Sequence, residues 1–225
     1  MSKIEVNLIS VHGDDEKIAN AAWTSYYSKE GKVKKTKEQA EALVKLLAEE
    51  GHHLPFEHTQ MTFHIKMPVA ISRQMMTHRV GVSSSNMSGR YRTMPSVWLD
   101  IPNDVFDILS KIPSYGSQVI NDYRDICTKA NDLYTSAVSS LKEGETMGNI
   151  SNTELKRARE FIRGMLPQHN MVESVTTFNL RSLAHFVKLR DKPNAQPEIQ
   201  FIAKEMVRLL KEIDFCPVAM QYLFV

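Results

Sequence analysis

The sequence predicts an α+β domain, in which helices and strands follow one another without the regular alternation of a doubly wound parallel sheet. Two observations lead to this prediction. A strand pattern at 61–67 and a β-branched run at 172–178 each lie among segments with helical periodicity. The 225 residues fit one large domain or two small ones. Because Gly and Pro are spread along the chain without forming a linker, we expect a single domain over residues 1–225.

The first predicted helix follows Thr36. Thr36 and Gln39 have the spacing of a capping box, and Gly51 is a stop signal. Between them, the apolar residues at helical spacing are Ala40, Leu43, Val44 and Leu47. The segment is therefore expected to form an amphipathic helix.

The next predicted element is a strand with one buried face. Met61, Phe63, Ile65 and Met67 alternate with polar residues, as in a half-buried strand. Pro68 is expected to end the strand and to open a second helix over about 69–79. On that helix Gln74 and His78, four residues apart, would share one face. The Ser- and Gly-rich residues 80–91 that follow are expected to form an ordered loop.

A long helix with a narrow apolar seam is predicted in the middle of the chain. The seam residues, in steps of three and four, are Ile120, Tyr123, Cys127, Ala130, Tyr134, Ala137 and Leu141. A seam of this kind usually packs against another helix, either in the same chain or in a second subunit.

Four more elements are predicted after this helix. Ser151 and Glu154 form a capping box for a helix that ends near Leu166-Pro167. The run 172–178 is predicted as a strand, and Asn179 as the N-cap of a helix through about Arg190. Pro197 is expected to start a last amphipathic helix, whose buried residues are predicted to be Ile199, Ile202, Met206, Leu209 and Ile213.

Composition limits the partners and the compartment. The 28 Lys and Arg against 26 Asp and Glu give a net charge of +2, which argues against binding of bulk nucleic acid, so a local cluster must meet any anion. Cys127 and Cys216 lie far apart without a CxxC pair, which favours a reducing compartment and argues against a metal site of zinc thiolates. The sequence shows neither a signal peptide nor a membrane-spanning apolar run, so we expect a cytoplasmic protein without membrane contact.

Two zones, 74–92 and 163–190, concentrate basic and amide residues, whereas the common dinucleotide, P-loop and zincin motifs are absent. Ser88-Gly89-Arg90 has the hydroxyl, the small residue and the guanidinium of a phosphate cradle, although such tripeptides also form ordinary turns. In the second zone, Arg181 and His185 share one helical face. That face is either a binding surface or a solvated polar face, and periodicity leaves both open.

Taken together, these segments resemble the flavin-dependent thymidylate synthases. Thr77-His78-Arg79 followed by Ser88-Gly89-Arg90-Tyr91 is similar to the family signature of Arg-His-Arg, a short spacer, Ser and Gly-Arg-Tyr. The supporting segments, in the family's order, are Pro55-Phe56-Glu57-His58, Thr62-Phe63-His64, Arg73-Gln74, Arg163 with Leu166-Pro167, Asn179-Leu180-Arg181-Ser182-Leu183, Arg190, and Ala195-Gln196 with Glu198-Ile199-Gln200. The resemblance extends from about Ala21 to Phe215.

This resemblance implies a reaction and a fold. The reaction is the reductive methylation of dUMP to dTMP, with methylene tetrahydrofolate as carbon donor, NADPH as reductant, FAD as hydride carrier and no cysteine nucleophile. The fold is that of thymidylate synthase-complementing proteins: mixed helices with an antiparallel-type sheet and a helical side layer. Family members are homotetramers with active sites at subunit interfaces.

The resemblance also implies the residues of the site. Those expected to bind FAD are Ser25, Glu57, His78, Arg79, Asn179, Arg181 and His185. Those expected to bind the nucleotide are Gln74, Asn86, Ser88, Gly89, Arg90, Arg163 and Arg190, of which Gln74, Ser88 and Arg190 are expected to be catalytic.

The chain departs from the family pattern at three points. Thr77 replaces the first Arg of the signature, the spacer to Ser88 holds eight residues instead of seven, and Asn86 stands at a usually acidic position. These departures leave two alternatives open. One is a flavin enzyme that methylates or hydroxymethylates another pyrimidine nucleotide such as dCMP. The other is a non-catalytic relative that binds nucleotides or RNA.

Overall fold

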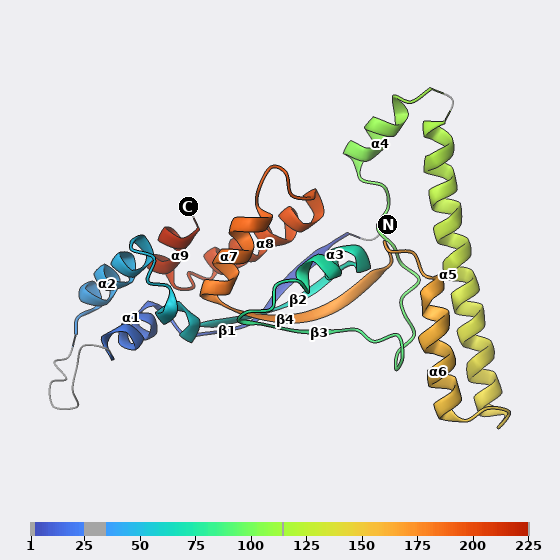
Figure 1. Ribbon diagram of the computed structural model, residues 1–225, viewed down its shortest axis with the longest axis horizontal. Helices are drawn as coiled ribbons and strands as arrows, with labels where there is room; N and C mark the ends of the chain where they lie inside the picture. Colours follow the sequence, from blue (N-terminus) through green and yellow to red (C-terminus); the bar gives the residue numbers. More distant parts are fainter. Residues whose placement is uncertain (1–2, 25–34, 114, 225) are drawn as a thin grey trace. The chain divides into compact units, whose positions relative to one another are not determined.

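A computed structural model describes residues 3–24, 35–113 and 115–224 of the chain. Its strands form a four-stranded antiparallel sheet in the order β1 (Glu5–His12), β2 (Gln60–Pro68), β4 (Met171–Asn179) and β3 (Val82–Asn86). Helices make up most of the remaining structure (Figure 1). The predicted α+β class with an antiparallel-type sheet is confirmed.

The chain divides into two compact units. The first comprises Met1–Ile4, Lys66–Arg73 and Asn86–Glu173, and the second comprises Glu5–Ile65, Gln74–Ser85 and Ser174–Val225. Among the described residues, no helix combines the length and the apolar character of a membrane span.

The second unit contains most of the short helices: α1 (Asp15–Trp23), α2 (Lys37–Glu49), the 3-10 helix η1 (Leu54–His58), α7 (Leu180–Arg190), α8 (Pro197–Glu212) and α9 (Pro217–Leu223). The capping box predicted for α2 is confirmed, since Thr36 and Gln39 each accept a hydrogen bond from the other's backbone N–H. Asn179 caps α7 as predicted, because its Oδ1 accepts from the Ser182 backbone N–H at 2.8 Å. These caps satisfy N–H groups that the first turn of a helix leaves unpaired.

The predicted buried face of β2 is confirmed, since Met61, Phe63, Ile65 and Met67 are at most 1% exposed. The prediction for α8 was partly wrong. Its buried stripe is Ile199, Ile202, Ala203, Met206 and Leu210. Leu209 is partly exposed and Ile213 lies beyond the helix end at 50% exposure, because a step of four from Met206 reaches Leu210.

Helix α9, which the sequence analysis missed, begins against α1. The Asp15 carboxylate accepts hydrogen bonds from the Val218 and Ala219 backbone N–H groups at 2.9 and 3.0 Å. Burial raises the pKa of Asp15, although these two hydrogen bonds oppose the shift. The carboxylate thus fixes the C-terminal helix to the start of the unit.

The first unit is built around α5 (Gly116–Thr146), which packs against α4 (Asn103–Ser110) and α6 (Asn152–Ile162). Figure 1 shows α6 beside the C-terminal part of the longer α5. The predicted long helix and the Ser151–Glu154 capping box are both confirmed. Ile120, Cys127 and Tyr134 of the predicted seam are buried, and Val138 joins them in place of the partly exposed Ala137 and Leu141.

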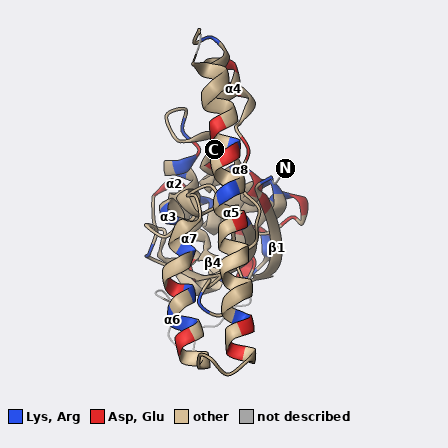
Figure 2. Cartoon of the chain, turned by 90° about the vertical axis from the view of Figure 1, so that its right-hand side faces the viewer, with Lys and Arg blue, Asp and Glu red and all other residues tan. Residues whose placement is uncertain are grey.

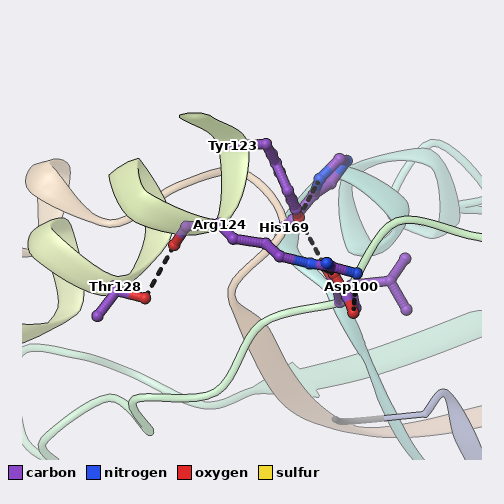
Figure 3. A network of polar contacts seen from close by, with 6 residues as sticks. Asp100, Tyr123, Arg124, Thr128 and His169 are labelled. Carbon is purple, nitrogen blue, oxygen red and sulfur yellow. Dashed lines mark hydrogen bonds and ion pairs between the residues drawn. The ribbon is translucent and has the colours of Figure 1, made fainter. Parts of the chain in front are cut away.

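A polar network holds the segment before α4 onto α5 (Figure 3). The Tyr123 hydroxyl donates to the Leu99 carbonyl at 2.5 Å and lies 3.0 Å from His169 Nδ1. Arg124 donates two hydrogen bonds to the Asp100 carboxylate, both at 3.0 Å. This pairing holds the pKa of Asp100 below its usual value.

Two predictions for residues 69–91 were wrong. Helix α3 (Val69–Met75) ends early because the Thr77 hydroxyl donates to the Gln74 carbonyl at 2.7 Å and the His78 N–H donates to the Met75 carbonyl. Gln74 and His78 therefore do not share a helix face. Part of the predicted loop 80–91 is strand β3, which pairs with β4 at the edge of the sheet. Because the residues of β3 are mostly exposed, its sequence is polar and lacks the alternation that marks a half-buried strand.

Candidate active site

A cleft of about 1060 Å³ lies within the second unit. It is lined by Ala48, His53, Thr77, His78, Arg79, Val80, Val82, Arg181, Ser182, Ala184, His185, Val187, Lys188, Asp191, Lys204, Val207, Lys211, Tyr222, Leu223 and Phe224. Among the described lining residues, the basic side chains outnumber the one carboxylate, that of Asp191, which pairs with Lys204 at 3.4 Å. The lining thus combines valine side chains with an excess of positive charge, a combination suited to a ligand that has both ring systems and phosphates.

His78 is held as a neutral imidazole at this cleft. Arg190 donates from Nε to His78 Nε2 at 3.0 Å, so Nε2 carries no proton and the ring proton is on Nδ1. Burial, together with the charges of Arg190 and His185, lowers the pKa of His78. The His78 ring meets the Phe186 and His185 rings edge to face, with centroids 5.0 and 6.4 Å apart.

A chain of hydrogen bonds continues from Arg190 to the start of α8. Arg190 also donates to the Thr77 hydroxyl at 3.4 Å, and that hydroxyl donates to the Gln74 carbonyl. The Gln74 side-chain amide in turn donates to Gln196 Oε1 at 2.7 Å. The network therefore joins two predicted catalytic residues, Gln74 and Arg190, through Thr77.

Gly81 allows the turn after His78 to lie directly on the start of α7. Its φ is +65°, and a Cβ there would stand 2.3 Å from both Asn179 Nδ2 and Ser182 Oγ. The Asn179 N–H donates to the Gly81 carbonyl, and the Ser182 hydroxyl donates to the Val80 carbonyl at 2.8 Å. Only glycine fits such a position without strain, and the close approach fixes the turn that carries His78 and Arg79.

Arg181, in the first turn of α7, forms an ion pair with Glu57 of η1 at 2.5 Å. Both side chains are partly exposed, so their charges remain accessible to a ligand. Ser25, the remaining predicted FAD residue, lies outside the described residues.

A second cluster of predicted site residues lies within the first unit. Ser88 starts a turn, because its carbonyl accepts from the Tyr91 and Arg92 N–H groups. Arg90 pairs with Glu160 of α6 at 2.8 Å. Gly89 is buried, and a Cβ on it would lie 3.1 Å from Arg163 Cδ and 3.0 Å from Met94 Cγ. The Ser88-Gly89-Arg90 segment is thus both a turn and the neighbour of a second arginine, Arg163.

The predicted site residues fall into two sets. Glu57, Gln74, His78, Arg79, Asn179, Arg181, His185 and Arg190 belong to the second unit, and Asn86, Ser88, Gly89, Arg90 and Arg163 belong to the first. Within each set the contacts above join most members.

Two residues in these contacts, Gln196 and Arg159, were not among the predicted site residues. Gln196 holds the Gln74 amide, and its only sequence signal was its place in the Ala195-Gln196 segment. Arg159 is buried on α6. Its spacing of four residues from Arg163 places both arginines on one face of the helix and was the signal available in the sequence.

Neither cysteine has the surroundings of a nucleophile. Cys127 and Cys216 are both buried with free thiols, and burial raises the pKa of each. The interpretation of both as packing residues is consistent with these surroundings.

Two solved structures share the fold. A UMP/dUMP methylase from Streptomyces cacaoi bound with 5-Br dUMP aligns with a TM-score of 0.72 at 24% identity, over 99% of this chain and 95% of that one. The same methylase bound with 5-Br UMP aligns with a TM-score of 0.70 at 24% identity, over 100% and 95%.

Relatives at higher identity are bacterial. The flavin-dependent thymidylate synthase of Kosmotoga olearia is 33% identical over 221 residues, which cover 95% of this chain and 86% of that protein. That of Thermosipho africanus is 34% identical over 208 residues, covering 92% and 86%. A family model described as thymidylate synthase complementing protein matches residues 7–218. Since this match spans nearly the whole chain and agrees with the fold and the signature residues, the chain belongs to the thymidylate synthase complementing protein family.

Proposed function

We propose that this protein is a flavin-dependent thymidylate synthase that converts dUMP to dTMP, with methylene tetrahydrofolate as carbon donor, NADPH as reductant and FAD as hydride carrier. The observation that carries the proposal is the cleft of the second unit, where His78, Arg79, Arg181 and His185 converge. The relatives named flavin-dependent thymidylate synthase support the same activity.

The residues of the cleft fit FAD. Its volume of about 1060 Å³ lies at the upper end of the range for ligand pockets, as a dinucleotide requires. Arg79 and Arg181 offer guanidinium groups for a diphosphate, and Val80, Val82 and Val207 offer apolar surface for rings. Asn179 and Glu57 hold these groups in place, through the α7 cap and the Arg181 ion pair.

When bound, FAD supplies the hydride that completes the methyl group. The chain's own residues position the pyrimidine and stabilise charge on it. In this proposal Arg190 places a guanidinium at the ring, where fixed positive charge stabilises developing negative charge without reorganisation. The hydrogen bond to His78 orients that guanidinium, and Gln74 contacts the base through its amide.

The nucleotide phosphate is assigned to the Ser88–Arg90 turn. Ser88 supplies a hydroxyl, Gly89 allows close approach of the backbone, and Arg90 and Arg163 supply charge. Asn86, the last residue of β3, is assigned to the same nucleotide. Because Arg90 pairs with Glu160, a phosphate must compete with that carboxylate for the guanidinium.

The active enzyme is further proposed to be a homotetramer whose active sites form at subunit interfaces. Large apolar side chains of the first unit are exposed, including Phe106 and Ile108 of α4 and Ile126 and Leu133 of α5. Side chains of this kind are typical of subunit interfaces. Light scattering on the purified protein measures the assembly directly.

The test is product formation from four components. The purified protein, loaded with FAD, is incubated with dUMP, methylene tetrahydrofolate and NADPH, and nucleotides are separated by chromatography. We expect dTMP in the complete mixture and none when FAD or NADPH is left out. A folded protein that binds flavin but forms no dTMP would refute the proposal.

One observation favours a second pyrimidine substrate. Thr77, a neutral residue, stands beside Arg190 where the family signature has a cation. If this change shifts the base preference, dCMP will displace bound dUMP, and its methylated or hydroxymethylated product will form faster than dTMP. A protein that remains colourless after reconstitution with FAD would instead favour a non-catalytic relative.

A further inference from the structure

Arg159 is a buried cation to which no described residue offers a carboxylate partner. The residue is 6% exposed, its Nε has no hydrogen-bond partner, and its Nη2 donates to the Thr93 hydroxyl at 3.3 Å. Across the part of the chain that the structure describes, no Asp or Glu forms an ion pair with it. Its neighbour Glu160 pairs instead with Arg90 at 2.8 Å and with Arg157 at 3.7 Å.

A guanidinium in this position is costly for the ligand-free protein. Arginine stays protonated at any pH that a folded protein tolerates, so Arg159 cannot relieve the cost by losing its proton. A buried charge is normally compensated by an opposite charge and by full hydrogen bonding. Among the described residues, the only hydrogen bond from the Arg159 guanidinium goes to the neutral hydroxyl of Thr93, so no carboxylate compensates its charge there.

The segment that Arg159 contacts is the one proposed to bind phosphate. Thr93 follows the Ser88–Arg90 turn by three residues, and Gly89 of that turn lies against Arg163. Arg159 and Arg163 are four residues apart in a continuous helical stretch, so they lie on one face. Figure 2 shows basic and acidic residues interspersed along α6. The segment 88–93 thus contacts two arginines of the same helical face.

We propose that Arg159 binds the 5′-phosphate of the nucleotide, together with Arg90 and Arg163. The inference rests on the proposed function in one respect, namely that a nucleoside monophosphate binds at the Ser88–Arg90 turn. A phosphate dianion supplies the charge that Arg159 lacks, and the guanidinium offers several donors in the fork geometry that phosphate accepts. The cost of the buried charge in the free protein is then offset by nucleotide binding.

This role predicts opposite effects of one substitution on stability and on binding. Arg159→Met keeps much of the side-chain volume and removes the buried charge. The ligand-free variant is therefore expected to unfold at the same temperature as the wild type or at a higher one. Its affinity for dUMP is expected to fall about ten- to a hundredfold, the usual loss for a hydrogen-bonded charge.

The experiment compares dUMP with deoxyuridine, which has no phosphate. Calorimetry on the full-length, FAD-loaded protein gives both affinities for the wild type, Arg159→Met, Arg159→Lys and Arg157→Met. Arg157 is the matched control, since it lies on the same helix with its side chain 71% exposed. We expect Arg159→Met to lose affinity for dUMP alone, Arg159→Lys to lose less, and Arg157→Met to keep both affinities within about twofold.

Equal losses for dUMP and deoxyuridine, or no loss for either, would overturn the role of Arg159. If Arg159→Met does not fold, Arg159→Lys decides, because it keeps the charge but not the fork geometry. An unchanged ratio of dUMP to deoxyuridine affinity in Arg159→Lys then counts against the proposal. A wild type that itself fails to distinguish dUMP from deoxyuridine would refute the phosphate site of the proposed function, and the role of Arg159 with it.

Discussion

Arg190, the last residue of α7, donates a hydrogen bond from Nε to Nε2 of His78, in the turn that follows α3, at 3.0 Å. The bond fixes the tautomer of His78 and the direction of the guanidinium in one contact. It joins His78, which is proposed to bind FAD, to Arg190, which is proposed to contact the pyrimidine. His78 is therefore better described as a neutral acceptor than as a second cation of the signature.

The first prediction concerns the protonation of His78. Its pKa lies below its ordinary value of 6.5, with burial as the largest cause and Arg190 as the next. Replacing Arg190 by Met removes one cause, so the pKa should rise while staying below 6.5. NMR titration of the ring nitrogens measures the pKa of His78 in both proteins. The same spectra report the tautomer, and a proton on Nε2 in the neutral wild-type ring would contradict the hydrogen bond from Arg190.

The sign of the stability effect follows from the same shift. As the pH falls below 6.5, the unfolded chain takes up a proton at His78 before the folded protein does. The contribution of His78 to the free energy of unfolding is therefore complete above pH 6.5 and declines as the pH falls toward the lowered pKa of the folded state. Arg190→Met should weaken this dependence.

The second prediction concerns the choice of base. Gln74 donates its amide N–H to Gln196, which leaves its own Oε1 free to accept the N3–H of uracil, a group that cytosine lacks. Gln196→Glu keeps an acceptor and should keep the preference for dUMP. Gln196→Lys offers only donors, so it should turn the Gln74 amide around and lower the ratio of dUMP to dCMP affinity about tenfold.

Calorimetry with both nucleotides checks this ratio in the two variants. The same ratio in both would show that Gln196 does not orient Gln74.

The third prediction concerns Gly81. Gly81→Ala forces a left-handed φ on an alanine and places Cβ against Asn179 and Ser182, so it should cost about 1–3 kcal/mol or more in unfolding free energy and reduce flavin retention. Gly51→Ala is the control, since Gly51 also has a positive φ but nothing lies within 4 Å of its added Cβ. Urea titration and the flavin-to-protein absorbance ratio separate the two effects. Full flavin retention in Gly81→Ala would contradict the role of this turn.

The fourth prediction concerns the competition between Glu160 and phosphate. Arg90→Ala should weaken dUMP binding by about 1.5–3 kcal/mol, the usual contribution of a hydrogen bond to a charged group. Glu160→Gln should strengthen it, because the guanidinium no longer has to leave a carboxylate. Deoxyuridine affinity is the control and should stay constant in both. Weaker dUMP binding in Glu160→Gln would mean that the ion pair positions Arg90 for the ligand.

Local signals predicted much of this fold from sequence. The two capping boxes, the Asn179 cap and the alternation in β2 each involve residues at most a few positions apart, so they leave a readable pattern. Strand β1 left none, because Val6 is its only fully buried residue. Helix α9 depends on Asp15, about two hundred residues earlier in the chain, which no local pattern reveals.

The sequence predicted which residues belong to the site, but not which of them contact one another. The signature residues indicated His78, Arg79 and Arg90, whereas the Arg190–His78 and Arg90–Glu160 contacts join residues that are far apart in sequence. The end of α3 at Met75 depended on a side-chain hydrogen bond from Thr77, which competes with helix continuation. The burial of Arg159 could not be predicted from its neighbours in sequence, because it depends on how α6 packs against the segment that contains Thr93.

Flavin-dependent methylation without a cysteine nucleophile is tested by measuring dTMP formation in a variant that has no thiols. Because Cys127 and Cys216 are buried and neutral, the FAD-loaded Cys127→Ala/Cys216→Ala variant, assayed below its unfolding temperature, should convert dUMP to dTMP at a rate close to that of the wild type. The same variant without FAD should form none. Loss of dTMP formation in a folded, flavin-loaded variant, or dTMP formation without FAD, would contradict the account.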